Sequence, residues 1–213
     1  MSDIIPLDPT GEDTPKSERR DAAANRERIL TIAQGLFDEH GVANVHMADI
    51  AKAAGVGKGT LYRRFANKGE LCLALMDDQF RDFQNVMLGR FRHLTGQNVP
   101  YLAQTEQFVD ALVQFSDSHS AYLCEVQQLE IDGPQGFGRP HYWNEMTIQG
   151  LLQQAMNAGE IPEETDIPVV ACMILAPLHA ANFRFLREGR GFLLEQVSQG
   201  MRYTIAGLRS GLG

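Results

Sequence analysis

The sequence has few features of a secreted, membrane-embedded or disulfide-rich protein. Its N-terminal stretch is polar and acidic, and no window approaches the roughly 18 consecutive apolar residues that a membrane-spanning helix needs. Its three cysteines, Cys72, Cys124 and Cys172, lie far apart in apolar helical stretches. This pattern predicts buried free thiols, and not a disulfide framework or a zinc site. Together these absences predict a cytoplasmic protein that does not enter a membrane.

Motifs of catalysis are also absent. The sequence has no G-x-S-x-G nucleophile elbow, and Gly136–Gly138 is too short for a phosphate-binding loop. The conceivable metal ligands lack the i, i+4 histidine spacing of a helical zinc site; they are His119, His141, His179 and Glu125. We therefore expect no enzyme, no catalytic residue, no metal ion and no cofactor.

The net charge of −8 is unevenly distributed along the chain. Residues 16–70 carry 10 Lys and Arg against 7 Asp and Glu, whereas residues 71–213 carry 9 Arg, no Lys, and 16 Asp and Glu. A basic N-terminal third on an acidic body is typical of a protein that touches nucleic acid with one end only. A random scatter of charges also produces so small an excess, so the charge pattern does not decide by itself.

Apolar residues recur at helical spacing along most of the chain, and no alternating β-branched stretch predicts a strand. A polar, proline-containing tail over residues 1–20 precedes this pattern, and we expect it to be disordered. The fold class is therefore all-α with about nine helices, and Pro177 predicts a kink in the eighth. The expected helices span residues 22–40, 47–54, 58–65, a long fourth helix from 67, 101–117, 120–131, 140–158, 166–186 and 192–208.

Residues 45–65 predict two short helices joined by a tight turn. Gly55 supplies the positive φ that such a turn needs, and Val56 fills the angle between the helices. Leu61 and Phe65, four residues apart, anchor the second helix inward. Slim, basic and hydrogen-bonding residues then face outward, as a helix in the major groove of DNA requires. This outward set is Lys58, Gly59, Thr60, Tyr62 and Arg63. A surface helical hairpin with incidental basic residues is the alternative.

The segment Ala22–Met76 resembles the N-terminal DNA-binding domain of the TetR family of repressors. The matching features are LFDEHG at the end of the first helix, DIAKAAGV, the recognition helix KGTLYRRF, and NKGEL at the entry to the fourth helix. The resemblance implies that the outward set lies in the groove and that Lys68 meets a phosphate. His46 and Gly57 depart from the family pattern, because hydroxyl side chains that could touch phosphate usually stand at those positions.

The resemblance also implies a helical C-terminal domain that binds a small molecule and forms a homodimer through its last two helices. We therefore expect a DNA-binding domain over residues 21–70, continuing into the long fourth helix, and a ligand-binding and dimerisation domain over residues 71–213. Long apolar stripes in the last two helices fit such an interface, although packing within one chain also explains them.

The C-terminal part is rich in aromatic residues and methionines, which favours an apolar or aromatic ligand with few polar groups. Ordinary core packing is the alternative for each of these residues. The residues expected to line the ligand site are Gln84, Met87, His119, Tyr122, Trp143, Met146, Met173 and His179.

We expect a homodimeric repressor that binds a palindromic operator in double-stranded DNA and is released by its ligand, with the long fourth helix as the lever. Two other functions remain open. A non-sensing architectural DNA-binding protein would show little sequence preference and no response to a ligand. A helical small-molecule-binding protein would show no salt-dependent binding to DNA.

Overall fold

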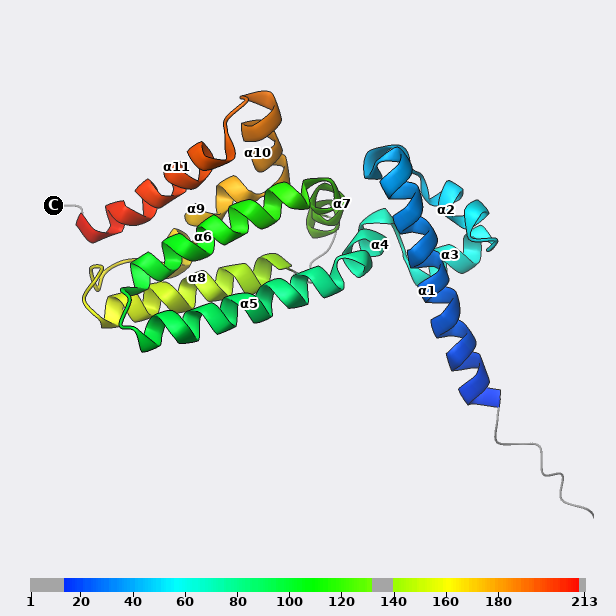
Figure 1. Cartoon of the computed structure of the whole chain (residues 1–213), viewed down its shortest axis with the longest axis horizontal. Coiled ribbons are helices and arrows are strands. Elements are labelled where there is room, and N and C mark those ends of the chain that lie inside the picture. Colours follow the sequence, from blue (N-terminus) through cyan, green and yellow to red (C-terminus); the bar gives the residue numbers. More distant parts are fainter. Residues whose placement is uncertain (1–13, 132–139, 211–213) are drawn as a thin grey trace, which may run out of the picture. The chain divides into compact units, whose positions relative to one another are not determined.

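The computed structural model describes residues 14–131 and 140–210, which form eleven α-helices and four short 3-10 or π turns, with no strand in these ranges (Figure 1). The all-α fold class is confirmed. The helix count exceeds the expected nine because the fourth and eighth predicted helices are each interrupted.

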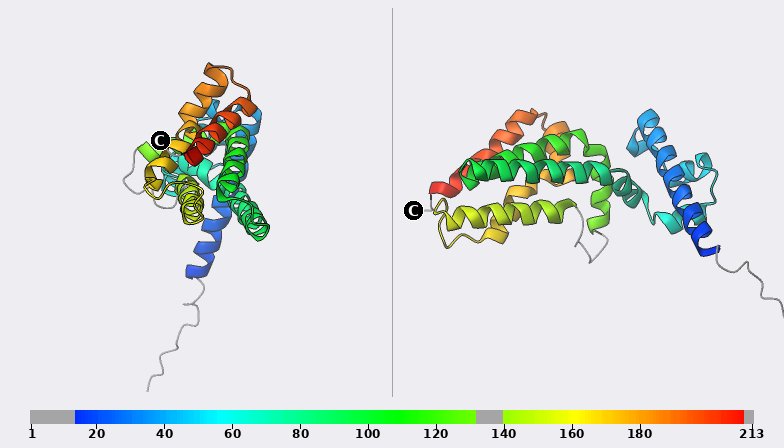
Figure 2. Two further views of the ribbon diagram at one scale, coloured as in Figure 1. Left: turned by 90° about the vertical axis from the view of Figure 1, so that its left-hand side faces the viewer. Right: turned by 60° about the horizontal axis from the view of Figure 1, so that its bottom comes forward.

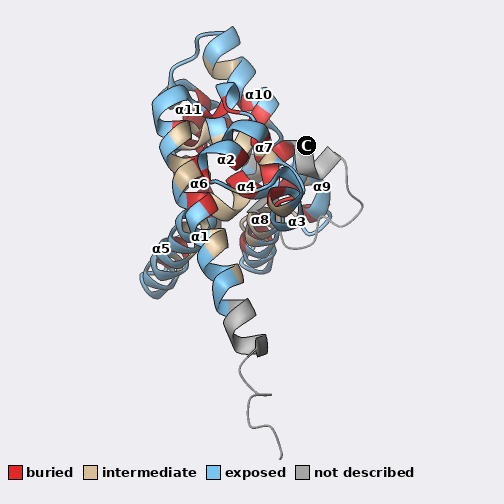
Figure 3. Cartoon of the chain, turned by 90° about the vertical axis from the view of Figure 1, so that its right-hand side faces the viewer, coloured by how far each residue is buried: buried red, intermediate tan, exposed pale blue. Residues whose placement is uncertain are grey.

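The chain divides into two compact units, Met1–Leu71 and Cys72–Gly213. The first contains α1 (Thr14–His40), α2 (Met47–Ala53), α3 (Lys58–Arg64) and the start of α4 (Lys68–Leu75). Figure 3 shows exposed residues over the outer faces of these helices. The buried residues that join them include Ile29, Ala33, Phe37, Val45, Ile50, Leu61 and Phe65.

Helix α1 begins earlier than the sequence pattern indicates. Residues 14–20 are helical, so the predicted disordered tail is wrong for that part, whereas residues 1–13 lie outside the described residues. Pro15 is compatible with the first turn of a helix, and the Glu, Arg and Ala residues that follow are good helix formers. Helix propensity therefore outweighs the lack of apolar periodicity there.

The long fourth helix is also a wrong prediction, because it is two helices, α4 and α5 (Asp77–Gly96). Met76 lies between them with φ −91° and ψ 0°, and its N–H donates to the carbonyls of Cys72 and Leu73 at 3.0 and 3.2 Å. The carboxylates of Asp77 and Asp78 occupy the first turn of α5, where negative charge favours a new helix start.

Helix α6 (Tyr101–Ser118) is the centre of the C-terminal unit (Figures 1 and 2). It packs against α11 (Leu194–Gly207) and against α8 (Pro140–Asn157), and α8 in turn packs against α9 (Ile167–Leu175). α7 (Ser120–Ile131) and α10 (Ala180–Arg184) complete the unit. The main buried side chains are Leu102, Phe108, Val109, Leu112, Val113, Ile148, Leu152, Met201 and Ile205.

Glu160 caps the N-terminus of α6. Its Oε1 accepts the N–H of Tyr101 at 2.7 Å, and its Oε2 accepts the N–H of Leu102 at 2.8 Å. Because the first N–H groups of a helix have no partner within the helix, this carboxylate caps α6 from outside it. The contact ties the segment after α8 to the central helix.

The kink predicted at Pro177 is confirmed. α9 ends at Leu175, a 3-10 turn follows at Ala176–Leu178, and the chain then bends by 46° into Ala180–Gly189. Proline lacks the N–H that would continue the helical hydrogen bonds. Within the described residues no single helix is long and apolar enough to cross a membrane, and this bent pair satisfies such a criterion only when its two halves are joined.

The cysteines differ in exposure. All three are free, but Cys72 is buried, Cys124 is half-buried and Cys172 is exposed, so the prediction of buried thiols is wrong for Cys172. Cys172 shares the outer face of α9 with Val169 and Met173, whose exposed fractions are 52% and 64%. The apolar sequence around Cys172 therefore does not indicate burial on all sides of this helix.

Candidate functional site

The turn between α2 and α3 is a Schellman motif. Gly55 has φ +64°, its N–H donates to the carbonyl of Lys52 at 3.2 Å, and the N–H of Val56 donates to the carbonyl of Ala51 at 3.0 Å. These two bonds close the end of α2, and glycine takes the left-handed conformation at little cost. The predicted turn is confirmed, and it fixes the direction in which α3 leaves.

The inner side of the helix pair is fully packed. Ile50 and Leu61 have no exposed surface, and Phe65 is 2% exposed. Arg26 of α1 places its guanidinium 5.3 Å from the centre of the Phe65 ring. α3 is thus held by its inner face, which leaves its outer face without a role in the core of this unit.

The outer face of α3 carries the predicted DNA-binding residues. Lys58, Gly59, Tyr62 and Arg63 are exposed, and Thr60 is half-buried beside Arg63, whose Nη2 donates to its hydroxyl at 3.5 Å. The phenol of Tyr62 is half exposed, at 50%. A surface with two cations, a hydroxyl and a phenol on one rigid helix can donate to phosphates and to base edges.

Gly57 and Gly59 leave the start of α3 without side chains, although there is room for a Cβ at both positions. A Cβ placed on Gly59 would meet no atom within 4 Å, and one on Gly57 would meet only Thr60 Oγ1, at 4.0 Å. Neither glycine has a positive φ. The fold therefore does not require glycine at either position. Gly57 is the N-cap of α3, a position that glycine also favours, whereas for Gly59 close approach of a partner to the backbone is a physical use of the missing side chain.

Lys68 differs from the α3 set. It is half-buried at the first position of α4, with its Nζ 6.0 Å from the centre of the Phe37 ring. Asn67 caps this helix as the sequence indicates, because its Oδ1 accepts the N–H of Glu70 at 2.9 Å. The ammonium of Lys68 thus stands at a capped helix start within the N-terminal unit.

Two residues near this surface were not among the predicted ones. Arg64 is exposed directly after Arg63, and its adjacency in the sequence was the available signal. At His46 the carboxylate of Asp49 accepts the backbone N–H at 3.0 Å. Asp49 thereby satisfies a backbone donor at the start of α2 although the usual hydroxyl residue is absent at 46.

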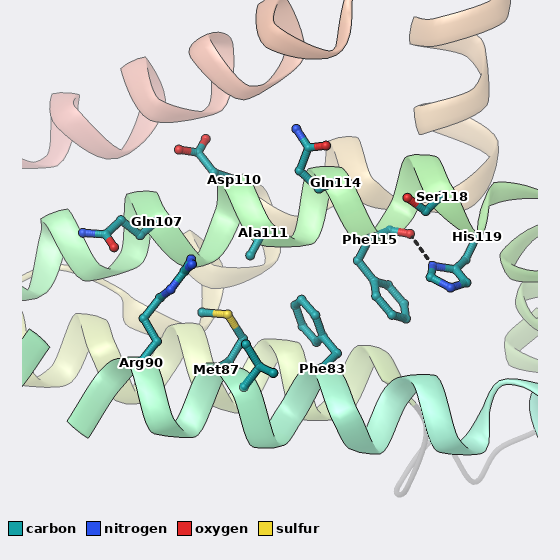
Figure 4. Close-up of a pocket in the computed structure, with 11 residues that line it drawn as sticks. Phe83, Met87, Arg90, Gln107, Asp110, Ala111, Gln114, Phe115, Ser118 and His119 are labelled. Carbon is teal, nitrogen blue, oxygen red and sulfur yellow. Dashed lines mark hydrogen bonds between the residues drawn. The ribbon is translucent and has the colours of Figure 1, made fainter. Parts of the chain in front are cut away.

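A groove of about 490 Å³ runs between α5 and α6 in the C-terminal unit, within the size range of small-molecule sites (Figure 4). We call it the α5–α6 groove. Its floor is apolar, and its rim is polar. The floor consists of Phe83, Val86, Met87, Ala111 and Phe115, and the rim of Arg90, Gln107, Asp110, Gln114, Ser118 and His119.

A second, much smaller hollow of about 10 Å³ lies behind the groove, where α8 joins α5 and α6. Phe83 and Phe115 line both spaces, with ring centres 4.8 Å apart, so this aromatic pair forms the partition. Trp143 of α8 lines the inner hollow. The centres of its ring and of the Phe83 ring are 6.2 Å apart, and the two rings are nearly perpendicular.

The predicted ligand-site residues are not gathered at one place. Met87 and His119 line the α5–α6 groove, and Gln84 and Trp143 line the inner hollow. Of the others, Tyr122 is half-buried on α7, Met146 and Met173 are exposed, and His179 hydrogen-bonds Gln127. A further hollow of about 580 Å³ beside α7 and α10 contains none of the predicted set. Among the described residues, no three His, Cys, Asp or Glu are grouped to hold a metal ion.

Further residues complete the groove. Phe83 and Phe115, which are among the aromatic residues of the C-terminal part considered as possible pocket residues, separate its two parts. The sequence did not single out Arg90 and Asp110, which bring its charges. The apolar period of α5 placed Phe83 on a packed face, but no local signal showed which helix would lie opposite it. Whether the eight predicted residues bind a ligand remains a prediction.

Known proteins agree with this architecture. Residues 29–75 match the family model of bacterial regulatory proteins, tetR family. Two HTH-type transcriptional regulators of Staphylococcus aureus are 30% and 39% identical over 177 residues, which is 83% of this chain and 90% of theirs. This chain is therefore a DNA-binding transcription regulator with a helix-turn-helix, and it belongs to the TetR family.

Solved structures share the fold. The transcriptional regulator FadR from Bacillus subtilis, in complex with stearoyl-CoA, has a TM-score of 0.60 at 18% identity, over 84% of this chain and 97% of that one. FadR of Thermus thermophilus, in complex with lauroyl-CoA, has a TM-score of 0.61 at 17% identity, over 84% and 92%. At these identities the likeness shows the fold alone.

Proposed function

We propose that this protein is a homodimeric, cytoplasmic repressor that is released from a palindromic operator by a small apolar or aromatic ligand. The observation that carries the DNA-binding part is the outer face of α3. Lys58, Tyr62 and Arg63 point to solvent from a helix whose inner face and entry turn are fixed. Such a surface is ready for the major groove without rearrangement.

We propose that Lys58, Gly59, Thr60, Tyr62 and Arg63 lie in the groove and that Lys68 contacts a phosphate. Lys68 is the first residue of α4, where the helix dipole also favours a phosphate although Asn67 caps the N–H of Glu70. A half-buried lysine positions a charge but reads no base. We therefore assign sequence preference to α3 and general affinity to Lys68.

We propose a homodimer through the last helices of the chain. Exposed apolar side chains on α9 and α11 support this, including Met173 at 64% and Tyr203 at 69% exposed. A two-fold dimer presents two copies of α3 to two half-sites, as a palindrome requires. Packing within one chain accounts for most of the apolar stripes themselves, because Ile174, Leu178, Val197, Met201 and Ile205 are buried in the core of this unit. The support for a dimer therefore comes from the exposed side chains alone.

We propose that the ligand binds in the α5–α6 groove and the hollow behind it. The apolar floor, the polar rim and the volume support this. The FadR structures with stearoyl-CoA and lauroyl-CoA are regulators of the same fold that bind molecules with long apolar chains. Because α4 and α5 are separate helices, we place the response to the ligand at Met76 and not in one rigid lever.

Selection of genomic DNA fragments by the purified protein tests this function. The selected fragment is measured again by fluorescence anisotropy across a salt series, with Tyr62→Ala as the variant. We expect a palindrome whose binding weakens with salt and with the substitution. Weak binding to all fragments, unchanged in Tyr62→Ala, would contradict specific repression and favour an architectural role.

A further inference from the structure

We propose that the ligand of the α5–α6 groove is an elongated apolar molecule that carries an ammonium group, and that Asp110 binds this group. The inference rests on the proposed function, because it names the chemical class of the regulator's ligand. Three observations support it: the length of the floor, the hydrogen-bonding state of Asp110, and that of His119.

The shape of the groove selects an elongated molecule. Its α6 wall runs from Gln107 to His119, which corresponds to about 18 Å at the rise of an α-helix. In Figure 4 the side chains of Phe83, Met87 and Phe115 project into the space between α5 and α6. Val86, on the same floor, is 63% exposed although it is apolar. Met87 is already buried, and an apolar chain lying along this floor would remove Phe83, Val86 and Phe115 from water.

Asp110 supplies a carboxylate at the rim of which only one oxygen is hydrogen-bonded among the described residues. Its Oδ2 accepts from Nη1 of Arg202 at 2.9 Å, while its buried Oδ1 has no hydrogen-bond partner among the described residues. The side chain as a whole is 33% exposed and lines the groove, and in Figure 4 its carboxylate points from α6 toward α11, so it must turn to meet a ligand on the floor. An ionised carboxylate accepts up to about four hydrogen bonds and donates none. The group that completes it must therefore be a donor.

His119 provides a second acceptor at the other end of the groove. Its Nδ1 lies 2.9 Å from the carbonyl oxygen of Phe115, the contact dashed in Figure 4, so the hydrogen must be on Nδ1. In the neutral ring Nε2 is then an acceptor. The ring stacks on Phe115 with centres 4.3 Å apart, which fixes its orientation. The groove thus offers acceptors at both ends of an apolar floor, which favours a ligand with N–H donors.

Arg90 is the groove's own cation and points to the alternative, a ligand with a carboxylate. Figure 4 shows Arg90 extending from α5 toward α6, near Gln107. Arg90 is exposed, so water can hydrogen-bond its guanidinium, whereas Oδ1 of Asp110 is buried and has no partner in the part of the chain that the structure describes. A ligand donor therefore gains more at Asp110 than a ligand carboxylate gains at Arg90.

The same carboxylate connects the groove to α11. Arg202, its partner, also donates to Glu195 at 2.5 Å and to Gln199 at 3.0 Å. An ammonium group at Oδ1 would share the carboxylate with Arg202 on Oδ2 and weaken the pairing of Arg202, which keeps its two partners on α11. Ligand binding would then loosen the tie between α6 and the last helix, which is the helix proposed for dimerisation.

Fluorescence of Trp143, the single tryptophan, reports binding in the full-length protein without DNA. The probes are decylammonium, decanol and decanoate below their micelle-forming concentrations, so that only the head group differs. We expect decylammonium to bind at least about tenfold more tightly than either of the others. Asp110→Asn should abolish this preference and leave decanol binding unchanged.

Asp117→Asn is the matched control. Asp117 lies on the same helix, pairs with Arg187 at 2.9 Å and has a similar exposure of 37%, but it is not part of the groove. The control should keep the preference for decylammonium. Equal binding of the three probes, a preference for decanoate that Arg90→Gln removes, or the same loss in Asp117→Asn would each overturn the proposal. The comparison of probes on the unsubstituted protein stands even where a variant fails to fold.

The DNA selection separates this result from the proposed function. A protein that selects a palindrome but shows no preference for decylammonium overturns only the ligand class. A protein that selects no DNA sequence overturns the repressor, whatever the fluorescence shows.

Discussion

Gly59→Ala separates a requirement of the fold from a requirement of the DNA complex. Gly59 is the second residue of α3, has no positive φ, and would place a Cβ where no atom of the chain lies within 4 Å. The substitution therefore adds one methyl group to the outer face and disturbs no contact described within the protein. Any effect on stability must come from helix propensity.

The expected effect on stability is a small gain. Alanine is about 1 kcal/mol more favourable than glycine in a helix interior, and the gain is smaller in the first turn. For a protein of this length a gain of 1 kcal/mol would raise Tm by about 2–4 °C. We expect the melting temperature of Gly59→Ala, followed by circular dichroism, to be equal to that of the original protein or higher by this amount.

The expected effect on DNA binding is opposite. If the backbone of α3 lies against the duplex at Gly59, the added methyl group must push the helix away from the DNA. We therefore expect at least tenfold weaker binding, which is a loss of about 1.4 kcal/mol in binding free energy. Fluorescence anisotropy on the selected operator measures this. Gly35→Ala is the control, since Gly35 is exposed in the middle of α1 and its Cβ would also meet nothing within 4 Å.

Two results would refute the reasoning. Full affinity in Gly59→Ala would mean that no DNA lies against the start of α3. A lower melting temperature would mean that the helix start is packed differently. In Gly35→Ala a similar stability gain with unchanged DNA affinity is expected, and a matching loss of affinity there would show that the effect is not local to α3.

Three further predictions follow from single contacts. Glu160→Gln should lower the free energy of unfolding by about 1–3 kcal/mol in urea, because an amide accepts only one of the two N–H groups that start α6; an unchanged midpoint would contradict this cap. Gly55→Ala should cost about 1–2 kcal/mol of stability at φ +64°, with Gly55→Asn milder in the same thermal melts, and equal losses would argue against a left-handed turn. Lys68→Ala should weaken binding to all DNA sequences alike and reduce the slope of log affinity against log salt by about 1, whereas a change confined to the operator would place Lys68 at a base.

The geometry of the proposed DNA-binding surface could be predicted from the sequence because its determinants are local. The turn depends on Gly55 and Val56, and α3 is anchored by Leu61 and Phe65 four residues apart. Hydrogen bonds and contacts over five residues or fewer leave a pattern in the sequence itself. The outward face of α3 follows once its inward face is known.

The interruption at Met76 shows where such patterns mislead. The apolar period continues from α4 into α5, so periodicity predicts one helix. The visible signal was the pair Asp77 and Asp78, since two acidic residues favour a helix start more than a helix interior. Cys172 shows the same limit, because an apolar sequence does not say which face of α9 meets the core.

The ligand groove depends on pairings that no local pattern contains. Asp110 and Arg202 are 92 residues apart, and the partition between groove and hollow brings Phe83 and Phe115 together from two helices. Residue types alone suggested a set of aromatic, methionine, histidine and glutamine side chains for the ligand site. Of this set, Met87 and His119 line the groove. The proposed ligand site therefore depends on the packing of α5, α6, α8 and α11, whereas the proposed DNA-binding residues lie within about one helical hairpin. If the groove is the proposed ligand site, substitutions at Asp110 or Phe115 would change ligand preference and leave the residues of the helix-turn-helix untouched.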